Sequence, residues 1–596
     1  MITVETTRPR NVDTWRAAAI LYGDWGTSKA YVLGLAFALA GHASFWFIFA
    51  VSILTILVGI NYIAICRLFP YGGGVYASVR KRSEVLSLVG AFFLISDYIV
   101  TAALSSVSAF HYLGVPHPEQ WAIGAIVLVG MLNFFGPRHT GSLAIALALP
   151  TVVVIVCLGI FSLPFLPQAI QSLEPPHESF AQNWNIFVTI IVALSGIEAI
   201  ANTTNSMRLN PGSTYENPIV TKTSTPAIIL VMLEVSFFTA LLGLAMNALP
   251  GLEISNGDVN APGFPNVRDA MMRYMGQVFA GTLFGASIGH LFGTIISIVI
   301  TLLLLSAVNT AIVALTSLFF VMSRDEELPA IFQRLNKFGV PIYATLVAFV
   351  PPAILLMVLS DVAGLADLYA IGFVGAIAVN LGSTSSNFEL NLKPWERFLM
   401  FGTFLIMTLI EITLFFDKPH ARNFVVSVMG LGLLLRALVA EQKTKILIRA
   451  TIRPLPELPP HTEECMLVAV TGLGKVLDYA IEESQHLKIP LQILFVREQK
   501  IVTPEDNQRL WVDDEGACEV FDYVSAKHYE TQLGFLYTVT DHTAHSIIEI
   551  AKNKKATRIF MGAHRRTNTF IRILRGTTIR DLSGVLPDEM DLMVVY

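Results

Sequence analysis

Apolar residues recur along the first 440 positions in segments of spanning length, separated by short polar loops. A helix needs about 20 apolar residues to cross a hydrocarbon layer of about 30 Å. This pattern predicts a polytopic α-helical membrane protein with twelve transmembrane helices. The predicted spans are 15–40, 44–67, 85–111, 119–136, 142–166, 184–207, 224–249, 286–322, 340–360, 364–383, 396–416 and 420–438. Segment 250–285 reads as an outer loop with a short amphipathic helix at Asn266 to Met275.

The pattern changes near Glu441, where short apolar runs begin to alternate with amphipathic segments. Continuous apolar strands alternating with helices are typical of a parallel sheet covered on both faces. We therefore expect a transporter domain at 1–440, a Pro-rich linker at 441–460 and a cytoplasmic soluble α/β domain at 461–596. The expected strands and helices are 465–470, 473–486, 491–496, 535–539, 544–552, 558–561 and 592–596.

Composition agrees with a membrane class, since 54% of residues are hydrophobic, 14% are charged and the mean hydropathy is +0.60. The net charge of −5 is mild and suggests no nucleic-acid partner. The cysteines lack the spacing of a disulfide framework or a zinc site. They are Cys66, Cys157, Cys465 and Cys518.

Basic residues gather in the loops that follow even-numbered spans and before the first span. Cytoplasmic loops carry the excess of Lys and Arg in membrane proteins. We therefore expect a multi-pass protein of the cell (inner) membrane, in contact with the lipid bilayer, with both termini cytoplasmic. No nucleophile–base or metal constellation is recognisable, so we do not expect an enzyme.

Two spans are interrupted by polar residues. Span one contains Asp24 and Lys29 within the stretch Tyr22 to Tyr31, and span six contains Ser195-Gly196-Ile197-Glu198-Ala199. Irregular backbone and ionisable groups at membrane depth line protein interiors or wet cavities. Because the two interruptions lie five spans apart, we expect broken helices 1 and 6 in a 5+5 inverted repeat, with a substrate site near the midplane.

Other polar residues within the spans are candidates for the same site. Span three carries Asp97, Tyr98, Thr101 and Ser105, of which Asp97, Thr101 and Ser105 share one helical stripe. Span ten carries Tyr369. Carboxylates, hydroxyls and the carbonyls of half-helix ends form an oxygen cage suited to a dehydrated alkali cation. Three acids near one base favour a cationic substrate.

Plainer interpretations stay open for each of these residues. Asp24 or Asp97 could cap a helix break, and Glu198 could be a gate or proton relay that does not touch the substrate. The hydroxyls of Thr101, Ser105 and Ser195 could bond to their own helices, and Tyr369 could be an interface aromatic. Lys29 could pair with an acid or snorkel. We treat three further residues as packing or relay residues: Glu234, His290 and Glu411.

The loop from Phe69 to Tyr76 with Arg80, and the segments 324–329 and 338–341, resemble the amino acid–polyamine–organocation superfamily. The stretch Tyr22 to Ser28 with Tyr31 resembles the first-helix signature of KUP and KimA-type potassium uptake permeases, except that Lys29 stands where proline is usual. The resemblance implies a potassium site and, apart from it, residues for proton coupling or gating. The potassium positions are Asp24, Tyr31, Asp97, Tyr98, Thr101, Ser105 and Tyr369, and the coupling positions are Glu198, Ser195 and Asp24.

The tail resembles a universal-stress-protein domain. The resemblance implies an adenine nucleotide as a regulator, held by a Gly-rich turn whose candidate positions are Gly562, Arg565, Gly576 and Thr577. The alternative is a module that serves only dimerisation, and we expect a homodimer through this domain.

Together these patterns predict a secondary importer of potassium ions, coupled to protons and requiring no cofactor. A transporter of amino acids or polyamines from the same superfamily is the first alternative. A transport-inactive membrane sensor is the second.

Overall fold

The computed structural model describes residues 10–562, with gaps at 73, 81, 136–139, 177, 215–216, 256, 263, 265, 337, 453–457, 459–463, 499–510, 528, 530 and 541–542. It also describes 582, 586–587 and 590–595. The chain divides into two compact units, one comprising Arg8–Val439 and the other containing Ala440–Tyr596.

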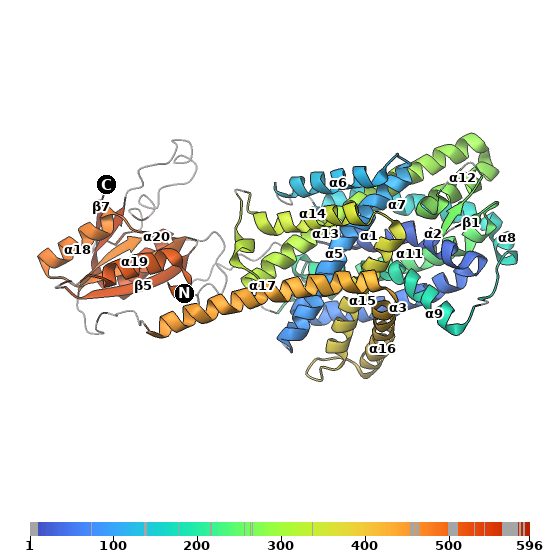
Figure 1. The fold of residues 1–596 in the computed structure, drawn as a ribbon. Helices are drawn as coiled ribbons and strands as arrows, with labels where there is room; N and C mark the ends of the chain where they lie inside the picture. The colour runs from blue at the N-terminus through green and yellow to red at the C-terminus, as the bar shows by residue number, and fades with distance from the viewer. Residues whose placement is uncertain are drawn as a thin grey trace. The chain divides into compact units, whose positions relative to one another are not determined.

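The first unit is helical, with one small hairpin, and its last helix begins in this unit and continues past Val439 (Figure 1). Its α-helices are α1 (Thr14–Trp25), α2 (Ser28–Ala40), α3 (Ser44–Leu68), α4 (Gly74–Arg80), α5 (Glu84–Leu113), α6 (Pro118–Asn133), α7 (Thr140–Ser162), α8 (Leu166–Gln171), α9 (Phe180–Thr189), α10 (Ala199–Thr203), α11 (Thr221–Ala245), α12 (Met271–Phe284), α13 (Ala286–Arg324), α14 (Ile342–Val358), α15 (Val362–Ser385), α16 (Pro394–Asp417) and α17 (Pro419–Ile452). The hairpin strands are β1 (Glu253–Ser255) and β2 (Asp258–Asn260). Short 3₁₀ helices are η1 (Gly41–Ala43), η2 (Leu163–Phe165), η3 (Ile190–Leu194), η4 (Thr204–Ser206), η5 (Met246–Ala248), η6 (Val267–Ala270) and η7 (Ala330–Gln333).

Nine helical segments within the described residues are long and apolar enough to cross a membrane. One of them, Thr14–Leu68, contains α1, α2 and α3 and covers the first two predicted spans. Helices α6 and α14, of 16 and 17 residues, lie at predicted spans four and nine and are shorter than the others. The chain is therefore a polytopic helical protein, as predicted, whereas the count of twelve spans stays a prediction.

Both predicted helix interruptions are present. Between α1 and α2, the Gly26 amide donates to the Tyr22 carbonyl oxygen (2.9 Å) and the Thr27 amide to that of Asp24 (3.1 Å). In the sixth span, the helical hydrogen bonds are interrupted between η3 and α10, where Gly196 has a φ of +99°. A positive φ favours glycine, so the glycine at position 196 is what allows the helix to break there.

Helix α5 carries the polar stripe of span three through the interior, and it packs against α13 and α15. Its approach to α15 is close at Gly372, where a Cβ atom would lie 2.8 Å from the Asp97 amide nitrogen. Figure 1 shows α5 beside α13 and α14. This packing holds Asp97 in the protein interior rather than against lipid.

The segments that enter span one and leave span six are tied together. The Val12 amide donates to the Ser206 carbonyl oxygen (3.0 Å), and the Arg208 amide donates to that of Val12 (2.9 Å). The Arg10 guanidinium reaches the carbonyl oxygens of Thr204 (3.1 Å) and Pro70 (3.2 Å). The loop after α3 therefore packs against this pair of segments.

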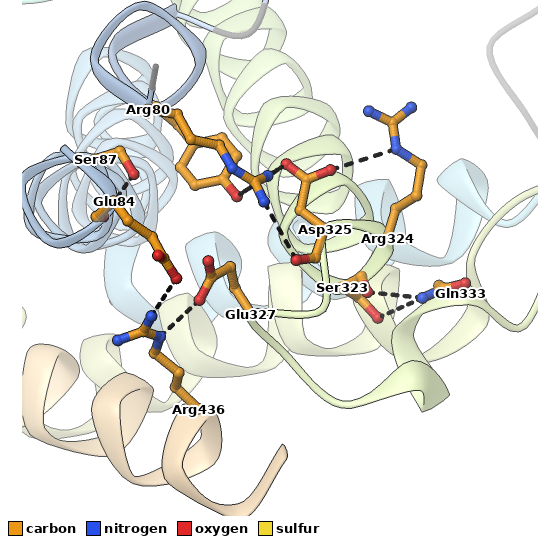
Figure 2. A network of polar contacts seen from close by, with 10 residues as sticks. Arg80, Glu84, Ser87, Ser323, Arg324, Asp325, Glu327, Gln333 and Arg436 are labelled. Carbon is orange, nitrogen blue, oxygen red and sulfur yellow. Dashed lines mark hydrogen bonds and ion pairs between the residues drawn. The ribbon is translucent and has the colours of Figure 1, made fainter. Parts of the chain in front are cut away.

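A polar network links α4, α5, α13 and α17 (Figure 2). Arg436 of α17 donates to Glu327 (2.7 Å), which follows α13, and also pairs with Glu84 at the start of α5. Arg80 of α4 pairs with Asp325, whose carboxylate also accepts a hydrogen bond from Tyr76 (2.9 Å). The consecutive helices α4 and α5 are thus joined to α13 and α17, which lie far from them in sequence.

The second unit contains a parallel sheet, as predicted. In the part of it that the structure describes, five strands lie in the order β5-β4-β3-β6-β7. Its elements are β3 (Cys465–Val470), α18 (Lys475–Leu487), β4 (Leu491–Glu498), η9 (Trp511–Asp513), α19 (Glu515–Ser525), β5 (Leu533–Thr540), α20 (Thr543–Asn553), β6 (Ala556–Gly562) and β7 (Asp591–Val595).

Alternation along β3 explains why both sheet faces are covered. Met466 and Val468 pack in one cluster with α18 and α19, whereas Leu467 and Ala469 pack in another with α20. Successive residues of a strand point to opposite faces, so an apolar strand needs helices on both sides. Helix α19 was not predicted, although Ala517, Val520, Phe521 and Val524 have helical spacing and are buried.

Candidate functional site

The two helix breaks lie against each other. A Cβ atom at Gly196 would lie 2.5 Å from the Trp25 amide nitrogen and 2.8 Å from the Asp24 carbonyl carbon. Such distances leave room for a hydrogen atom and no side chain. The absence of a side chain at Gly196 therefore lets the interruption of span six touch that of span one.

Three buried carboxyl groups gather around this contact. Asp24, Asp97 and Glu198 are 4%, 0% and 1% exposed and come from α1, α5 and the break before α10. Asp97 and Glu198 interact electrostatically with each other, and the charge of Asp24 acts on both. Like charges this close repel, so the cluster favours a bound proton or cation.

Several oxygens of the cluster have no hydrogen-bond partner among the residues that the structure describes. They are both carboxylate oxygens of Asp97, Oε1 of Glu198 and the hydroxyls of Tyr62 and Tyr369. Buried polar atoms in proteins are nearly always paired, so each exception needs an explanation. Carboxylate and hydroxyl oxygens gathered in one place can together bind an alkali cation. The chemistry of the cluster therefore fits a monovalent metal ion.

Hydroxyl groups near the breaks bond to their own helices. Thr101 donates to the Asp97 carbonyl oxygen (2.8 Å), and Ser195 donates to that of Val192 (2.9 Å). Each hydroxyl keeps lone pairs that could still face a ligand. These bonds agree with the plainer interpretation of both residues and leave their membership of the site a prediction.

The other predicted site residues are buried in the same region. The Tyr31 hydroxyl lies beside Ser195 and Thr27, and the Tyr98 hydroxyl accepts a hydrogen bond from Asn202 (2.6 Å). The charges of the three buried acids act on the Tyr369 hydroxyl, and the Tyr369 ring lies 5.4 Å from the ring of Phe373. Ser105 is buried on α5.

Lys29 does not take part in this cluster. Its ammonium group donates to both carboxylate oxygens of Glu234, at 2.8 Å each. Lys29 is the base that the sequence placed beside the acids, and its partner is on α11. Lys29 is therefore paired outside the cluster of Asp24, Asp97 and Glu198.

Two further polar residues adjoin the site and were not predicted. The Tyr62 hydroxyl of α3 interacts electrostatically with Glu198 and lies beside Asn380 of α15. The Asn61-Tyr62 pair in an otherwise apolar span was a usable signal. Asn202, the partner of Tyr98, belongs to the polar run after the second break.

The nucleotide candidates of the tail are mostly outside the described residues. Gly562 ends β6, whereas Arg565, Gly576 and Thr577 fall within the segment 563–581, which the structure does not describe. A nucleotide site stays a prediction.

Comparison with known proteins shows which family and which proteins this chain is similar to. The family model described as "Amino acid permease" matches residues 12–440. The potassium transporter KimA of Bacillus subtilis is 24% identical over 521 residues, covering 81% of this chain and 80% of that protein.

Two Kup proteins match over shorter stretches. A probable potassium transport system protein Kup 1 of Bradyrhizobium is 28% identical over 183 residues, covering 27% of this chain and 30% of that protein. A low affinity potassium transport system protein Kup of Enterobacter is 25% identical over 219 residues, covering 31% of this chain and 35% of that protein. This chain therefore spans about a third of the length of the Kup proteins that it matches.

Proposed function

Because this chain belongs to the amino acid permease family, we propose that it is a secondary transporter that imports potassium ions together with protons. The membrane potential would favour entry of a cation, at about 2.3 kcal/mol per charge per 100 mV. The protein would act as a permease and carry out no chemical conversion.

The observation that carries this proposal is the set of buried, unpartnered oxygens where the two helix breaks meet. Asp97, Glu198, Tyr62 and Tyr369 present such oxygens, and Asp24 lies beside them. An organic ammonium would need a volume lined by apolar groups for its carbon skeleton, whereas a bare cation needs oxygens alone. The names of the potassium-transporting relatives support the same substrate.

Proton coupling follows from the crowding of carboxyl groups. A proton bound by one of these interacting acids would relieve the repulsion among them. Loading of Glu198 or Asp24 with a proton from outside would then accompany each potassium ion. Ser195, which adjoins Glu198 in the same break, would adjust that step.

The remaining architecture belongs to the same proposal. Twelve spans with a 5+5 inverted repeat would let one half rock against the other around the fixed site. An even number of spans, together with the basic loops, would put both termini on the cytoplasmic side of the cell (inner) membrane. The tail would form a homodimer, resemble a universal-stress-protein domain and bind an adenine nucleotide as a regulator.

The test is rubidium uptake by purified protein in proteoliposomes. Wild-type protein should accumulate rubidium, potassium should compete, and acidification of the lumen should accompany uptake. Asp24→Asn should lower uptake at least about tenfold, the equivalent of about 1.4 kcal/mol. Glu253→Gln is the matched control, because Glu253 is an exposed acid of the β1 strand. Absence of any flux would favour a sensor instead.

Transport of amino acids or polyamines is the second candidate, and the description of the matching family favours it. A polyamine would also be attracted by Asp24, Asp97 and Glu198. Competition decides between the two: excess potassium should abolish rubidium uptake, whereas amino acids and putrescine should leave it unchanged. Uptake of labelled putrescine or amino acid would contradict the potassium proposal.

A further inference from the structure

A buried ion pair that involves the helices flanking the first break is not part of the candidate site. The Lys29 ammonium donates to both carboxylate oxygens of Glu234 (2.8 Å and 2.8 Å), and the Tyr22 hydroxyl donates to Glu234 Oε1 (3.0 Å). The same ammonium lies 3.4 Å from the Tyr22 hydroxyl and 5.1 Å from the centre of its ring. The pair joins α2 to α11, with Tyr22 contributed by α1.

Every group in this triad is nearly inaccessible. The side chains of Lys29 and Glu234 are 1% and 12% exposed. A charged amine inside a membrane protein is costly unless an acid and further hydrogen-bonding groups surround it. The Glu234 carboxylate and the Tyr22 hydroxyl supply those groups, so Lys29 can remain a cation in the interior.

Helix geometry keeps this cation away from the site. Tyr31, which lies beside Ser195 at the second break, follows Lys29 by two residues. Two residues correspond to about 200° around an α-helix, so the two side chains leave α2 on opposite sides. The charge that acts on Lys29 is that of Glu234.

We propose that Glu234 sets the cation affinity of the transporter by holding and neutralising Lys29 on the far side of α2. The inference rests on the proposed function and adds to it a positioning residue that does not touch the ion. Without the Glu234 charge, Lys29 would be an uncompensated buried cation on the same helix as Tyr31 and would repel the transported ion. If the charges of Lys29 and Glu234 were removed together, the electrostatic potential at the transported ion would return close to that in the wild type.

The experiment is a double-mutant comparison in proteoliposomes, with the KM and the maximal rate of rubidium uptake measured separately. The variants are Glu234→Gln, Lys29→Met and Lys29→Met/Glu234→Gln, each compared with the wild type. Glu234→Gln should raise KM about tenfold, the order of effect for an unscreened charge within a protein interior. Lys29→Met/Glu234→Gln should return KM to within about twofold of the wild-type value, because neither charge then remains.

Other outcomes separate this inference from a purely structural role. A pair that only fastens α2 to α11 would lower the maximal rate and leave KM unchanged, and the double variant would be as impaired as the single variants. If Glu234→Gln fails to fold, Lys29→Met/Glu234→Gln still decides: a raised KM in that variant overturns the proposal. A wild-type protein that takes up no rubidium refutes the proposed function itself, whereas an active wild type with an unchanged KM in Glu234→Gln refutes the role of Glu234 alone.

Discussion

The contact between the two helix breaks predicts that Gly196→Ala is severely damaging. An alanine there would place its Cβ atom 2.5 Å from the Trp25 amide nitrogen, with a φ of +99°. The left-handed backbone costs about 1–2 kcal/mol for an L-residue, and overpacking of an interior costs about 1–3 kcal/mol. Separation of the breaks could relieve the overpacking, but it would displace Glu198 from Asp97.

Gly212→Ala separates these two contributions. Gly212 also has a positive φ, of +87°, but a Cβ atom there would meet nothing within 4 Å. This control carries the backbone cost of about 1–2 kcal/mol without the overpacking. A difference between the two variants therefore measures the close approach of the breaks.

The assay combines rubidium uptake with the unfolding temperature in detergent. We expect Gly196→Ala to lose most of its uptake and to unfold at a lower temperature than Gly212→Ala, which should transport nearly as well as the wild type. Wild-type uptake by Gly196→Ala would refute the reasoning, because it would mean that the two breaks need not touch for transport.

Three further predictions concern other parts of the chain. Gly372→Ala should separate α15 from α5 and lower rubidium uptake. Gly402→Ala has open space around its Cβ position, so it should leave the free energy of unfolding unchanged or raise it by about 0.5–1 kcal/mol. Equal uptake by the two variants would contradict the close packing of α5 and α15. Arg436→Gln should lower the free energy of unfolding by about 1–3 kcal/mol, because Glu327 then stays buried without its partner. Unfolding in denaturant measures this loss, and Arg436→Gln/Glu327→Gln should recover part of it. Burial raises the pKa of the Cys465 thiol to about 11. Iodoacetamide should therefore modify this thiol slowly at pH 8, and faster only as the pH approaches the pKa. Rapid modification at pH 8 under native conditions would be inconsistent with the burial of Cys465.

The sequence was informative where polar residues interrupt an apolar span. Glycine, hydroxyl and acid residues in such a position have few uses other than a break, so both interruptions could be predicted. The strands of the tail could be predicted for a similar reason, because apolar runs bounded by turns suit a covered sheet.

The sequence was less informative about which side chains meet. Lys29 and Glu234 are 205 residues apart, and nothing in their local sequence indicates that α2 and α11 bring them together. The contact of Gly196 with Trp25 depends likewise on the approach of two segments that periodicity describes separately. Local patterns specify which faces of a helix are polar, whereas tertiary packing selects the partners.

The backbone pairing of Val12 with Ser206 and Arg208 bears on how the half of span one before Gly26 and the half of span six after Gly196 could move. Two main-chain hydrogen bonds join the strand-like entry to α1 with the exit from η4. A tilt of either half-helix would move the other with it, so the two would rotate together about Gly26 and Gly196. If the chain transports as proposed, opening at this end of the two spans would be one concerted step, without a stage in which one half-helix moves alone.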